Sequence, residues 1–401
     1  MIKILHLITD LDRGGAEYCL KRLVERMDTR RFSSRIVSIL PLGPLGKELR
    51  TEHIHVDTLN CATIRDIPRA FWKLRQIILT AEPDIIQTWL YHADLLGTLV
   101  SLLRKRGRLV WNVRNSDLSQ EKRADWQVLT SLLALMSGLP DCIVSNSVAG
   151  IESHVKRGYT TPRWSHIPNG WNIEDSAPTA ERRRRQREIY GLPTDEVLIG
   201  LVARRAPQKD FGCFLSAVAL LHNRCPGLKF VLIGKDVSEG KQEFKDALTG
   251  IGVQDRLIFL GEQANVESLL PALDAVTLTS AYGEGMPNSI GEAMAAGLPV
   301  IATDVGDVRR LIIDGNWIVT PKAPEELASA WIALAGLEPD ARAAIGARNR
   351  NWIEENYTIE HMREQYEGLY AWVMQPQPVA GLESALAQNV KPSAGALVRE
   401  L

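Results

Sequence analysis

The stretch SAYGEGMPNSIGEAMAAGLPVIATDVG, from Ser280 to Gly306, decides how this chain is expected to fold. Its glycines, its two prolines and the carboxylates Glu284 and Glu292 lie between two short apolar runs, VTLTS and PVIAT. Apolar runs of about five residues bounded by Gly and Pro are typical of buried strands in a parallel sheet. The glycine-rich part is therefore predicted to be a loop that leads into a short crossover helix. Ligands bind where strand ends meet helix starts in such a sheet, so this loop is a candidate binding site.

Strand-like and helix-like patterns alternate along the first half of the chain. Short apolar runs are found at 3–8, 35–40, 55–59, 84–89, 108–113 and 141–147, and helical spacing is found at 16–27, 68–81 and 93–106. This alternation predicts a parallel α/β sheet with right-handed crossovers. The segment 166–193 breaks the pattern with prolines, glycines and a charged run, and the alternation restarts at 196–202. The sequence therefore predicts two parallel α/β domains joined by a linker.

The domain boundaries follow from these changes of pattern. The predicted parts are a first domain at 1–172, a linker at 173–195, a second domain at 196–357, a last amphipathic helix at 358–374 and a tail at 375–401. Thr358 suits the N-cap position of the last helix. The tail is rich in Pro, Ala, Gly and Ser and has few aromatic residues, so it is expected to be poorly ordered.

The composition limits the class of protein. With 401 residues, 45% of them hydrophobic, the chain has room for two or three domains with sizeable cores. A net charge of -1 argues against a general nucleic-acid binder, which is usually basic. The five cysteines are scattered and form no CxxC pair, as expected of a reduced cytosolic protein without a structural zinc site. MIKILHLITD is interpreted as a first strand rather than a signal peptide, and no run of about 18 apolar residues predicts a membrane span.

The two carboxylates of the opening stretch have different explanations. Ser289 and Glu292 fit an S-x-x-E capping box, which would make Glu292 structural. Glu284 lies between glycines in a loop, where no local structure requires a carboxylate. In a binding site, backbone amides at the start of the predicted helix 288–296 would face a phosphate. The carboxylates beside them would accept hydrogen bonds from sugar or ribose hydroxyls.

Two further loops follow the first strands of the two domains. VARRAPQKDF places Arg204, Arg205 and Lys209 at a strand-to-helix turn, either as solvated charges or as contacts to a diphosphate. DRGGAEY places Gly14 and Gly15 where a backbone could approach a ligand closely, or simply in a tight turn. It does not match G-x-G-x-x-G, so a dinucleotide site is poorly supported.

Other polar residues are ambiguous from the sequence alone. His92 precedes a predicted helix, where a histidine more often packs or caps than catalyses, and Arg114 with Asn115 ends a first-domain strand and could line a cleft. The run ERRRR at 181–185 is interpreted as the solvated face of a linker helix. RKRGR at 104–108 is interpreted as a basic helix end, with contact to an anionic membrane surface as the alternative.

Four motifs resemble those of one protein family. EGMPNSIGE is similar to the E-x7-E signature of the retaining family 4 (group 1) glycosyltransferases of the GT-B fold, and ARRAPQK resembles their G-R-x-x-x-x-K segment. GGAE looks like their N-terminal glycine loop, and HIPNGWN looks like the P-N-G segment between the lobes. The resemblance extends from Ile2 to about Met374. It implies an α/β protein with two Rossmann-like domains facing across a cleft, the last helix crossing back to the first domain.

The resemblance also implies roles for individual residues. Arg204 and Lys209 would bind the donor diphosphate, Glu284 would contact the transferred sugar, and Glu292 would hold the ribose; we take Glu284, Arg204 and Lys209 as the candidate catalytic residues. The implied donor-binding residues are Gly14, Gly15, Met286, Pro287, Asn288, Ser289 and Glu292. Members of the family transfer a sugar from a UDP- or GDP-linked donor to a hydroxyl with retention of configuration. They need no cofactor and usually no bound metal.

The chain departs from the family pattern on the acceptor side. Relatives often show H-x-H where this chain has Gln87 and Trp89, and T-x-H where it has Asn112 and Arg114. Acceptor roles are therefore not carried over, and His92, Arg114 and Asn115 are retained only as cleft candidates.

QTWLYHADLLG and WNVRNSD look like a bacterial subgroup associated with capsule, exopolysaccharide or O-antigen assembly. Its usual acceptor is a saccharide or a polyprenol-linked saccharide, which implies a cytoplasmic protein with peripheral contact to the inner membrane. Two alternatives are a nucleotide-sugar epimerase or phosphorylase on the same fold, and a non-catalytic nucleotide-sugar-binding protein.

Overall fold

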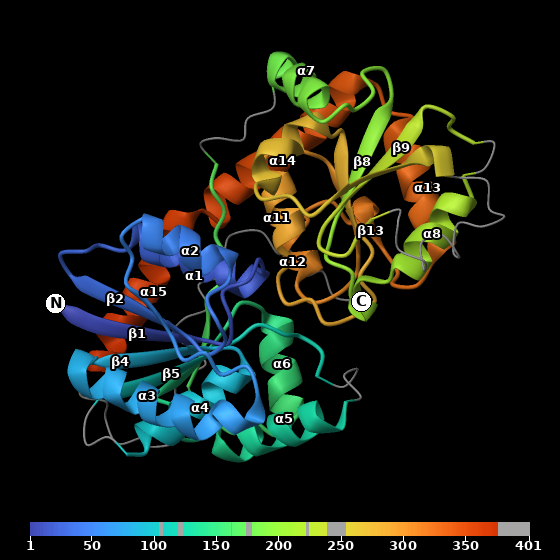
Figure 1. Ribbon diagram of the computed structural model, residues 1–401. Coiled ribbons are helices and arrows are strands. Elements are labelled where there is room, and N and C mark those ends of the chain that lie inside the picture. Colours follow the sequence, from blue (N-terminus) through green and yellow to red (C-terminus); the bar gives the residue numbers. More distant parts are fainter. Residues whose placement is uncertain are drawn as a thin grey trace, which may run out of the picture.

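The computed structural model describes residues 1–103, 107–118, 123–161, 163–173, 179–221, 224–238 and 254–375. Two α/β domains lie side by side, each built on its own sheet (Figure 1). The first sheet has seven strands and the second has six, and every pairing within them is parallel. The predicted fold class, two parallel α/β domains, is therefore confirmed.

The first sheet has the strand order β3-β2-β1-β4-β5-β6-β7. Its strands are β1 Ile2–Ile8, β2 Phe32–Ser38, β3 Val56–Thr58, β4 Ile85–Trp89, β5 Arg108–Val113, β6 Cys142–Ser145 and β7 Trp164–His166. Its helical segments are α1 Gly15–Arg26, α2 Pro44–Thr51, η1 Ile64–Asp66, α3 Ile67–Ala81, α4 Tyr91–Ser101, α5 Ala124–Met136 and α6 Val148–Lys156. Helices α3, α4 and α5 cover one face, and α1 and α2 pack on the other.

The second sheet has the strand order β10-β9-β8-β11-β12-β13. Its strands are β8 Val197–Val202, β9 Leu228–Ile233, β10 Leu257–Gly261, β11 Ala275–Leu278, β12 Val300–Thr303 and β13 Ile318–Val319. The helical segments are α7 Ala180–Ile189, η2 Pro207–Lys209, α8 Phe211–Ala219, η3 Gln254–Arg256, α10 Val266–Leu269, η4 Leu270–Ala272, α11 Asn288–Ala295, α12 Val308–Leu311, η5 Gly315–Trp317, α13 Pro324–Ala335, α14 Pro339–Asn356 and α15 Ile359–Met374.

The strand order places a topological switch point in each sheet. In the first sheet β1 lies between β2 and β4, and in the second β8 lies between β9 and β11. Crossovers leave in opposite directions from such a point, so a crevice opens at the carboxyl ends of the strands. The Gly14–Gly15 turn follows β1, the Arg204–Lys209 loop follows β8, and the Glu284 loop follows β11. The three loops singled out in the sequence therefore begin at the two switch points.

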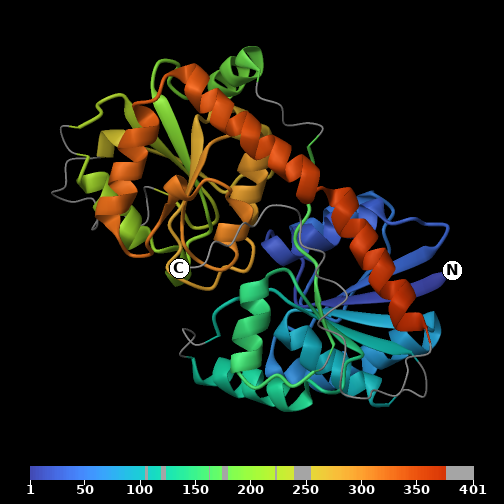
Figure 2. The same ribbon diagram turned by 180° about the vertical axis from the view of Figure 1, so that it is seen from behind.

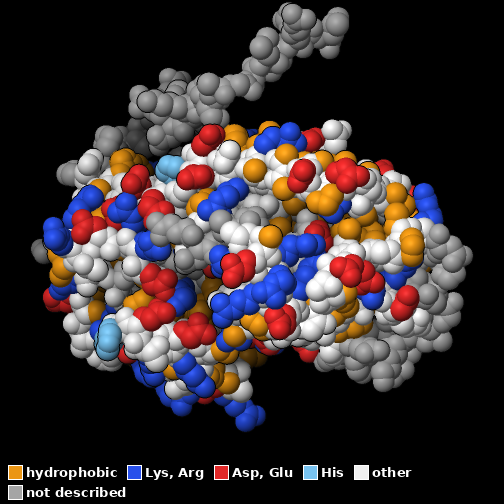
Figure 3. Space-filling view, turned by 90° about the horizontal axis from the view of Figure 1, so that it is seen from above, with side chains coloured by type: hydrophobic (Ala, Val, Ile, Leu, Met, Phe, Trp, Pro, Cys, Tyr) orange, Lys and Arg blue, Asp and Glu red, His pale blue; other side chains and the backbone are white. Residues whose placement is uncertain are grey.

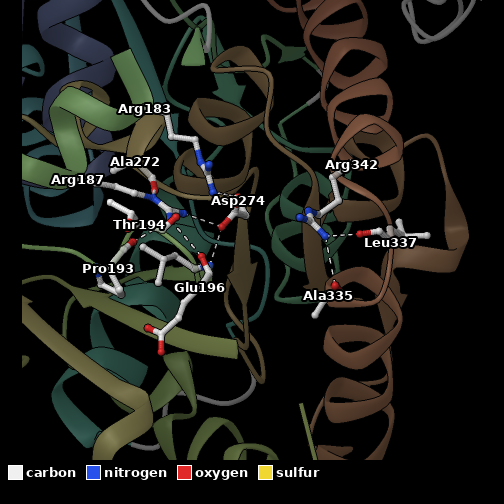
Figure 4. Close-up of polar contacts among 11 residues, drawn as sticks. Arg183, Arg187, Pro193, Thr194, Glu196, Ala272, Asp274, Ala335, Leu337 and Arg342 are labelled. Atoms are coloured by element: carbon white, nitrogen blue, oxygen red, sulfur yellow. Dashed lines mark hydrogen bonds and ion pairs between the residues drawn. The ribbon is translucent and has the colours of Figure 1, made fainter. Parts of the chain in front are cut away.

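Helix α7 is fixed to the second domain by a buried arginine. Arg187 donates to the carbonyl oxygens of Ala272 at 2.9 Å and Pro193 at 2.8 Å, and to Asp274 Oδ2 at 2.8 Å (Figure 4). Its side chain is only 1% exposed. Arg183, within the run expected to be solvated, also pairs with Asp274, at 2.7 Å. The solvated interpretation of that run is therefore incomplete for Arg183, whose side chain is 39% exposed but paired, because α7 packs against η4, beside the residue that precedes β11.

Helix α15 packs on the first domain although it follows the second in sequence. Met362, Tyr366, Tyr370 and Val373 are buried in the same core as α1 and the first sheet. Figure 2 shows α14 and α15 crossing from one domain to the other. The expected N-cap is confirmed, since the Thr358 side chain accepts from His361 N at 3.1 Å.

Parts of several predictions fall outside the described residues. These are residues 376–401 of the tail, 104–106 of the basic run, 174–178 of the linker, 119–122 and 162 of the first domain, and 222–223 and 239–253 of the second domain. None of the helices in the described part of the chain combines the length and the apolar character that a membrane span requires.

Candidate active site

A cleft of about 980 Å³ lies between the two domains. Residues of α1 and of the loop before it line one side, and residues that follow β8 and β11 line the other. Seen from above, Lys and Arg side chains gather with acidic ones over the middle of the molecule (Figure 3). Among the predicted donor-side residues, the cleft is lined by Gly14, Gly15, Arg204, Lys209, Glu284, Met286, Asn288, Ser289 and Glu292. Pro287 is buried and is not among the lining residues.

Lys209 and Glu284 meet within this cleft. Lys209 Nζ lies 2.5 Å from Glu284 Oε1, and the Ser280 hydroxyl donates to the same oxygen at 2.6 Å. The side chains of Lys209 and Glu284 are 17% and 12% exposed. Lys209 is therefore held in the site rather than solvated, whereas Arg204 is an exposed side chain at the cleft wall.

Both domains hold the backbone of the Glu284 loop. Ser116 of the first domain donates its hydroxyl hydrogen to the carbonyl oxygen of Glu284. Gly306 has a φ of +57°, and a Cβ added there would lie 1.9 Å from the same oxygen. Only glycine fits this close approach without displacing the loop. The position of the Glu284 side chain thus depends on contacts from two directions.

Asp307 links the Glu284 loop to the first domain. Its backbone N–H donates to the carbonyl oxygen of Gly285 at 2.9 Å. Its carboxylate accepts from the backbone N–H groups of Val148 at 2.8 Å and Ala149 at 2.9 Å, at the start of α6. An acidic group at a helix N-terminus satisfies orphan donors and is favoured by the helix dipole. Sequence reasoning did not single out Asp307, because the donors that it meets lie in the other domain.

The start of α11 shows that one structural interpretation was wrong. The N-cap of α11 is Pro287, and no side chain caps the helix. The expected Ser289–Glu292 capping box is therefore absent, because the helix begins at Asn288 and Glu292 lies one turn inside it. Glu292 Oε1 instead accepts from Arg22 Nη2 of α1 at 2.8 Å. Burial raises the pKa of Glu292, and the charge of Arg22 opposes this rise.

The P-N-G segment also reaches the α11 loop. Asn169 Nδ2 donates to the carbonyl oxygen of Met286 at 3.0 Å and to Asn288 Oδ1 at 2.9 Å. Asn288 Nδ2 in turn donates to the carbonyl oxygen of Gly15 at 3.2 Å. A Cβ at Gly15 would lie 2.8 Å from that amide nitrogen, so the glycine permits the close approach. These contacts bring the glycine turn of the first domain to the start of α11.

Glu17, in the first turn of α1, is a further cleft residue that the sequence did not reveal. It is only 6% exposed and lines the cleft. Burial, helped by the charge of Asp10, raises the pKa of Glu17 to about 7. Glu17 is the last residue of the GGAE motif, but no role was assigned to it, because an acidic residue is common in the first turn of a helix.

Of the three acceptor-side candidates, the structure places some at the cleft and others away from it. Arg114 lines the cleft, with its guanidinium 5.6 Å from the centre of the Trp89 ring. Asn115 follows it in sequence but is not among the residues that line the cleft, and its side chain accepts from Asp117 N at 3.0 Å. His92 is exposed near the start of α4, 6.4 Å from the Trp126 ring, and is not among the residues that line the cleft. Helical spacing turns its neighbour Tyr91 into the core and directs His92 toward α5.

Two of the four positions that depart from the family pattern, Gln87 and Asn112, contact the last helix. Gln87 accepts a hydrogen bond from the Tyr370 hydroxyl, and Asn112 Nδ2 donates to the Tyr366 hydroxyl at 2.8 Å. Both polar residues are fully buried. Their side chains therefore attach α15 to the first sheet and do not face a substrate.

Comparison with known proteins identifies the family. Residues 13–175 match the model of Glycosyltransferase Family 4, and residues 196–336 match that of Glycosyl transferases group 1. The putative glycosyltransferase EpsF of Bacillus subtilis is 30% identical over 370 residues, which cover 88% of this chain and 91% of that protein. The chain belongs to the family 4 (group 1) glycosyltransferases.

Other relatives agree with this assignment. An Escherichia coli protein named UDP-Gal:alpha-D-GlcNAc-diphosphoundecaprenol alpha-1,3-galactosyltransferase is 25% identical, over 92% of this chain and 96% of that protein. The crystal structure of Anabaena Alr3699/HepE in complex with UDP-glucose has a TM-score of 0.81 at 23% identity, covering 92% of this chain and 100% of that one. This structural likeness shows the GT-B fold of the glycosyltransferase. None of these three relatives is named as an epimerase, a phosphorylase or a non-catalytic binding protein.

In the part of the chain that the structure describes, no group of three or more His, Cys, Asp and Glu side chains is arranged to hold a metal ion. The cleft is lined by many cations besides Lys209 and Arg204, namely Arg13, Lys21, Arg22, Arg26, Arg114, Arg205 and Lys235. Among its carboxylates, Glu284 pairs with Lys209 and Glu292 pairs with Arg22.

Proposed function

We propose that this glycosyltransferase moves a sugar from a UDP- or GDP-linked donor to a hydroxyl of a saccharide or polyprenol-linked saccharide. In this proposal the anomeric configuration is retained, and neither a cofactor nor a metal ion takes part. The product would enter a bacterial surface polysaccharide such as a capsule, an exopolysaccharide or an O-antigen. The observation that carries the proposal is the contact of Lys209 with Glu284 at 2.5 Å inside the interdomain cleft.

The contact joins two groups with complementary tasks. When the glycosidic bond to phosphate breaks, negative charge develops on the leaving diphosphate and positive character on the sugar. Lys209 and Arg204 would stabilise the diphosphate as fixed cations, helped by the first-turn amides of α11. Glu284 would exchange its bond with Lys209 for hydrogen bonds to the sugar hydroxyls. The described geometry therefore supports a site that assembles when the donor displaces one ion pair.

Retention requires that the new bond forms on the face from which the leaving group departs. In the front-side mechanism that the family resemblance implies, the acceptor oxygen bonds to the anomeric carbon. At the same time, the bond between the anomeric carbon and the diphosphate oxygen breaks. The proton of the acceptor hydroxyl passes to a donor phosphate oxygen. Under this scheme the chain need not supply a general base. Arg114 and Asn115 remain proposed acceptor contacts on the first-domain side.

The acceptor class is proposed from the relatives and from one surface. The Escherichia coli relative is named for a diphosphoundecaprenol-linked substrate, and a Staphylococcus aureus relative is a capsular polysaccharide biosynthesis glycosyltransferase. Exposed apolar side chains lie on the neighbouring helices α4 and α5: Leu99 and Leu102 on or just after α4, and Val128, Leu132 and Leu135 on α5. This apolar surface supports peripheral contact with the cytoplasmic face of the inner membrane.

Transfer by the purified full chain tests the proposal. UDP-glucose, UDP-galactose, UDP-N-acetylglucosamine and GDP-mannose would each be supplied with a panel of polyprenol-linked and free saccharides, and product linkage would be read by NMR. Lys209→Ala and Glu284→Ala are each expected to lower transfer by about 100-fold or more while the protein stays folded.

The matched control is Lys229→Ala, which removes a lysine of the same domain that pairs with Glu196 at 3.0 Å outside the cleft. Wild-type turnover in the Lys209 or Glu284 variant would contradict the site assignment. Inversion of configuration in the product would contradict the proposed mechanism.

A further inference from the structure

One arginine of the first domain bridges two carboxylates of the second domain. Arg22 Nη2 lies 2.8 Å from Glu292 Oε1 on α11 and 2.7 Å from Glu267 Oε1 on α10. The Arg22 side chain is 10% exposed and that of Glu292 is 14% exposed. The bridge therefore spans the cleft at the carboxylate proposed to hold the ribose. Arg22 and Glu292 are largely shielded from solvent, and Glu267, whose side chain is 47% exposed, lies at the edge.

The bridge belongs to one face of α1. Gly15, Tyr18 and Arg22 are spaced by three and four residues, so they lie on the same side of the helix. The carbonyl oxygen of Gly15 accepts from Asn288, the Tyr18 hydroxyl lies 3.5 Å from the carbonyl oxygen of Ala264, and Arg22 pairs with Glu292. This face of α1 thus contacts the second domain at successive turns, and Arg22 supplies its charged contact.

The ionised form of the Glu292 carboxyl group depends on the charge of Arg22. Both carboxylates use Oε1 for the same guanidinium nitrogen, so they lie close together and repel each other. Without Arg22, burial and the charge of Glu267 would both favour the protonated form of Glu292. In the described contacts Arg22 engages only Oε1 of Glu292, which leaves Oε2 to accept a hydroxyl hydrogen.

We propose that Arg22 is a positioning residue that keeps Glu292 ionised and aimed at the ribose and ties that carboxylate to the first domain. Binding of the nucleotide ribose and closure of the cleft then reinforce each other, since each aligns the same carboxylate. This inference rests on the proposed function, because it assumes that a nucleoside diphosphate occupies the cleft. It adds a first-domain residue to a subsite whose other groups come from the second domain.

The inference is tested by comparing two ligands, UDP and its 2′,3′-dideoxy analogue, in their binding to the variants Arg22→Met and Arg22→Lys. If the wild type binds GDP instead, GDP and its dideoxy analogue are used. Arg22→Met is expected to weaken binding of UDP by about 10- to 100-fold but binding of the dideoxy analogue by less than about threefold. Small-angle scattering should show that UDP contracts the wild type but not this variant. Arg22→Lys retains a charge and should recover part of both effects.

The control is Arg31→Met, which removes an exposed first-domain arginine that pairs with Glu367 of α15 at 3.5 Å, away from the cleft. Equal weakening of UDP and its analogue, or no weakening of either, would overturn the role of Arg22. If Arg22→Met does not fold, Arg22→Gln removes the same charge with a polar side chain, and a wild-type preference for UDP over the analogue in Arg22→Gln would overturn the role. Failure of the wild type to bind any nucleoside diphosphate would instead contradict the proposed function.

Discussion

Replacing Glu284 by glutamine should separate binding of the diphosphate from transfer of the sugar. In the wild type, Glu284 Oε1 accepts from Lys209 at 2.5 Å and from Ser280 at 2.6 Å. The side-chain amide in the Glu284→Gln variant would keep one acceptor oxygen but lose the negative charge. A hydrogen bond to a charged group contributes about 1.5–3 kcal/mol, so loss of the sugar contact should lower kcat/KM by about 10- to 150-fold.

The affinity of the Glu284→Gln variant for UDP or GDP alone should not fall with kcat/KM and should stay equal or rise. Lys209 no longer has a carboxylate partner in the variant, so the diphosphate need not compete for the ammonium group. We expect the nucleoside diphosphate to bind equally well or up to about tenfold more tightly, measured by calorimetric titration. Glu196→Gln makes the same change in an ion pair outside the cleft, with Lys229 at 3.0 Å, and should leave both quantities unchanged. Weaker nucleotide binding with an unchanged kcat/KM would refute the assignment of Glu284 to the sugar.

Three further variants test the surrounding structure. Arg187→Met removes the buried partner of Asp274 and should lower the free energy of unfolding of the second domain by about 3–5 kcal/mol, measured by urea unfolding. A decrease in this free energy of less than about 1 kcal/mol would contradict the anchoring role of Arg187. Glu17 has a pKa raised to about 7, so its stabilising contribution is full below the ordinary value of 4.5 and is lost as the pH rises through 7. Glu17→Gln should therefore have the same stability as the wild type near pH 4.5 but be more stable by about 3 kcal/mol at pH 8. A difference that does not depend on pH would count against a buried carboxyl at position 17. Gly306→Ala should lower turnover at least about tenfold by displacing the Glu284 backbone. The control Gly315→Ala places its Cβ in open space and should leave turnover unchanged. Equal activities of the two variants would show that the Glu284 loop tolerates the shift.

The sequence predicted the features that depend on local pattern. Short apolar runs bounded by Gly and Pro predicted the strands of both parallel sheets, and the glycine-rich segment after β11 was expected to enter a helix at Asn288, where α11 begins. Strand ends of a parallel sheet meet at one edge, so charged residues that follow β8 and β11 could be expected in one place. Lys209 and Glu284, 75 residues apart, are in contact there.

The features that the sequence did not reveal depend on how the two domains meet. The S-x-x-E pattern suggested that Glu292 caps α11, but the side chain reaches Arg22, 270 residues away. Asp307 meets backbone donors of α6, and backbone donors leave no trace in a residue pattern. Arg187 follows a run of arginines in which Arg184 and Arg185 are exposed, and only the docking of α7 distinguishes it from them. Periodicity describes a single element and carries no information on such pairings.

A crystal structure of the full chain grown with the nucleoside diphosphate that it binds, UDP or GDP, is the measurement that tests the central claim most directly. The account predicts the diphosphate within about 3 Å of Lys209 Nζ and the Arg204 guanidinium, and the ribose hydroxyls at Glu292. Lys209 should then have exchanged Glu284 for phosphate oxygen. A nucleotide bound outside the interdomain cleft, or one bound within it while Lys209 still pairs with Glu284, would contradict the claim.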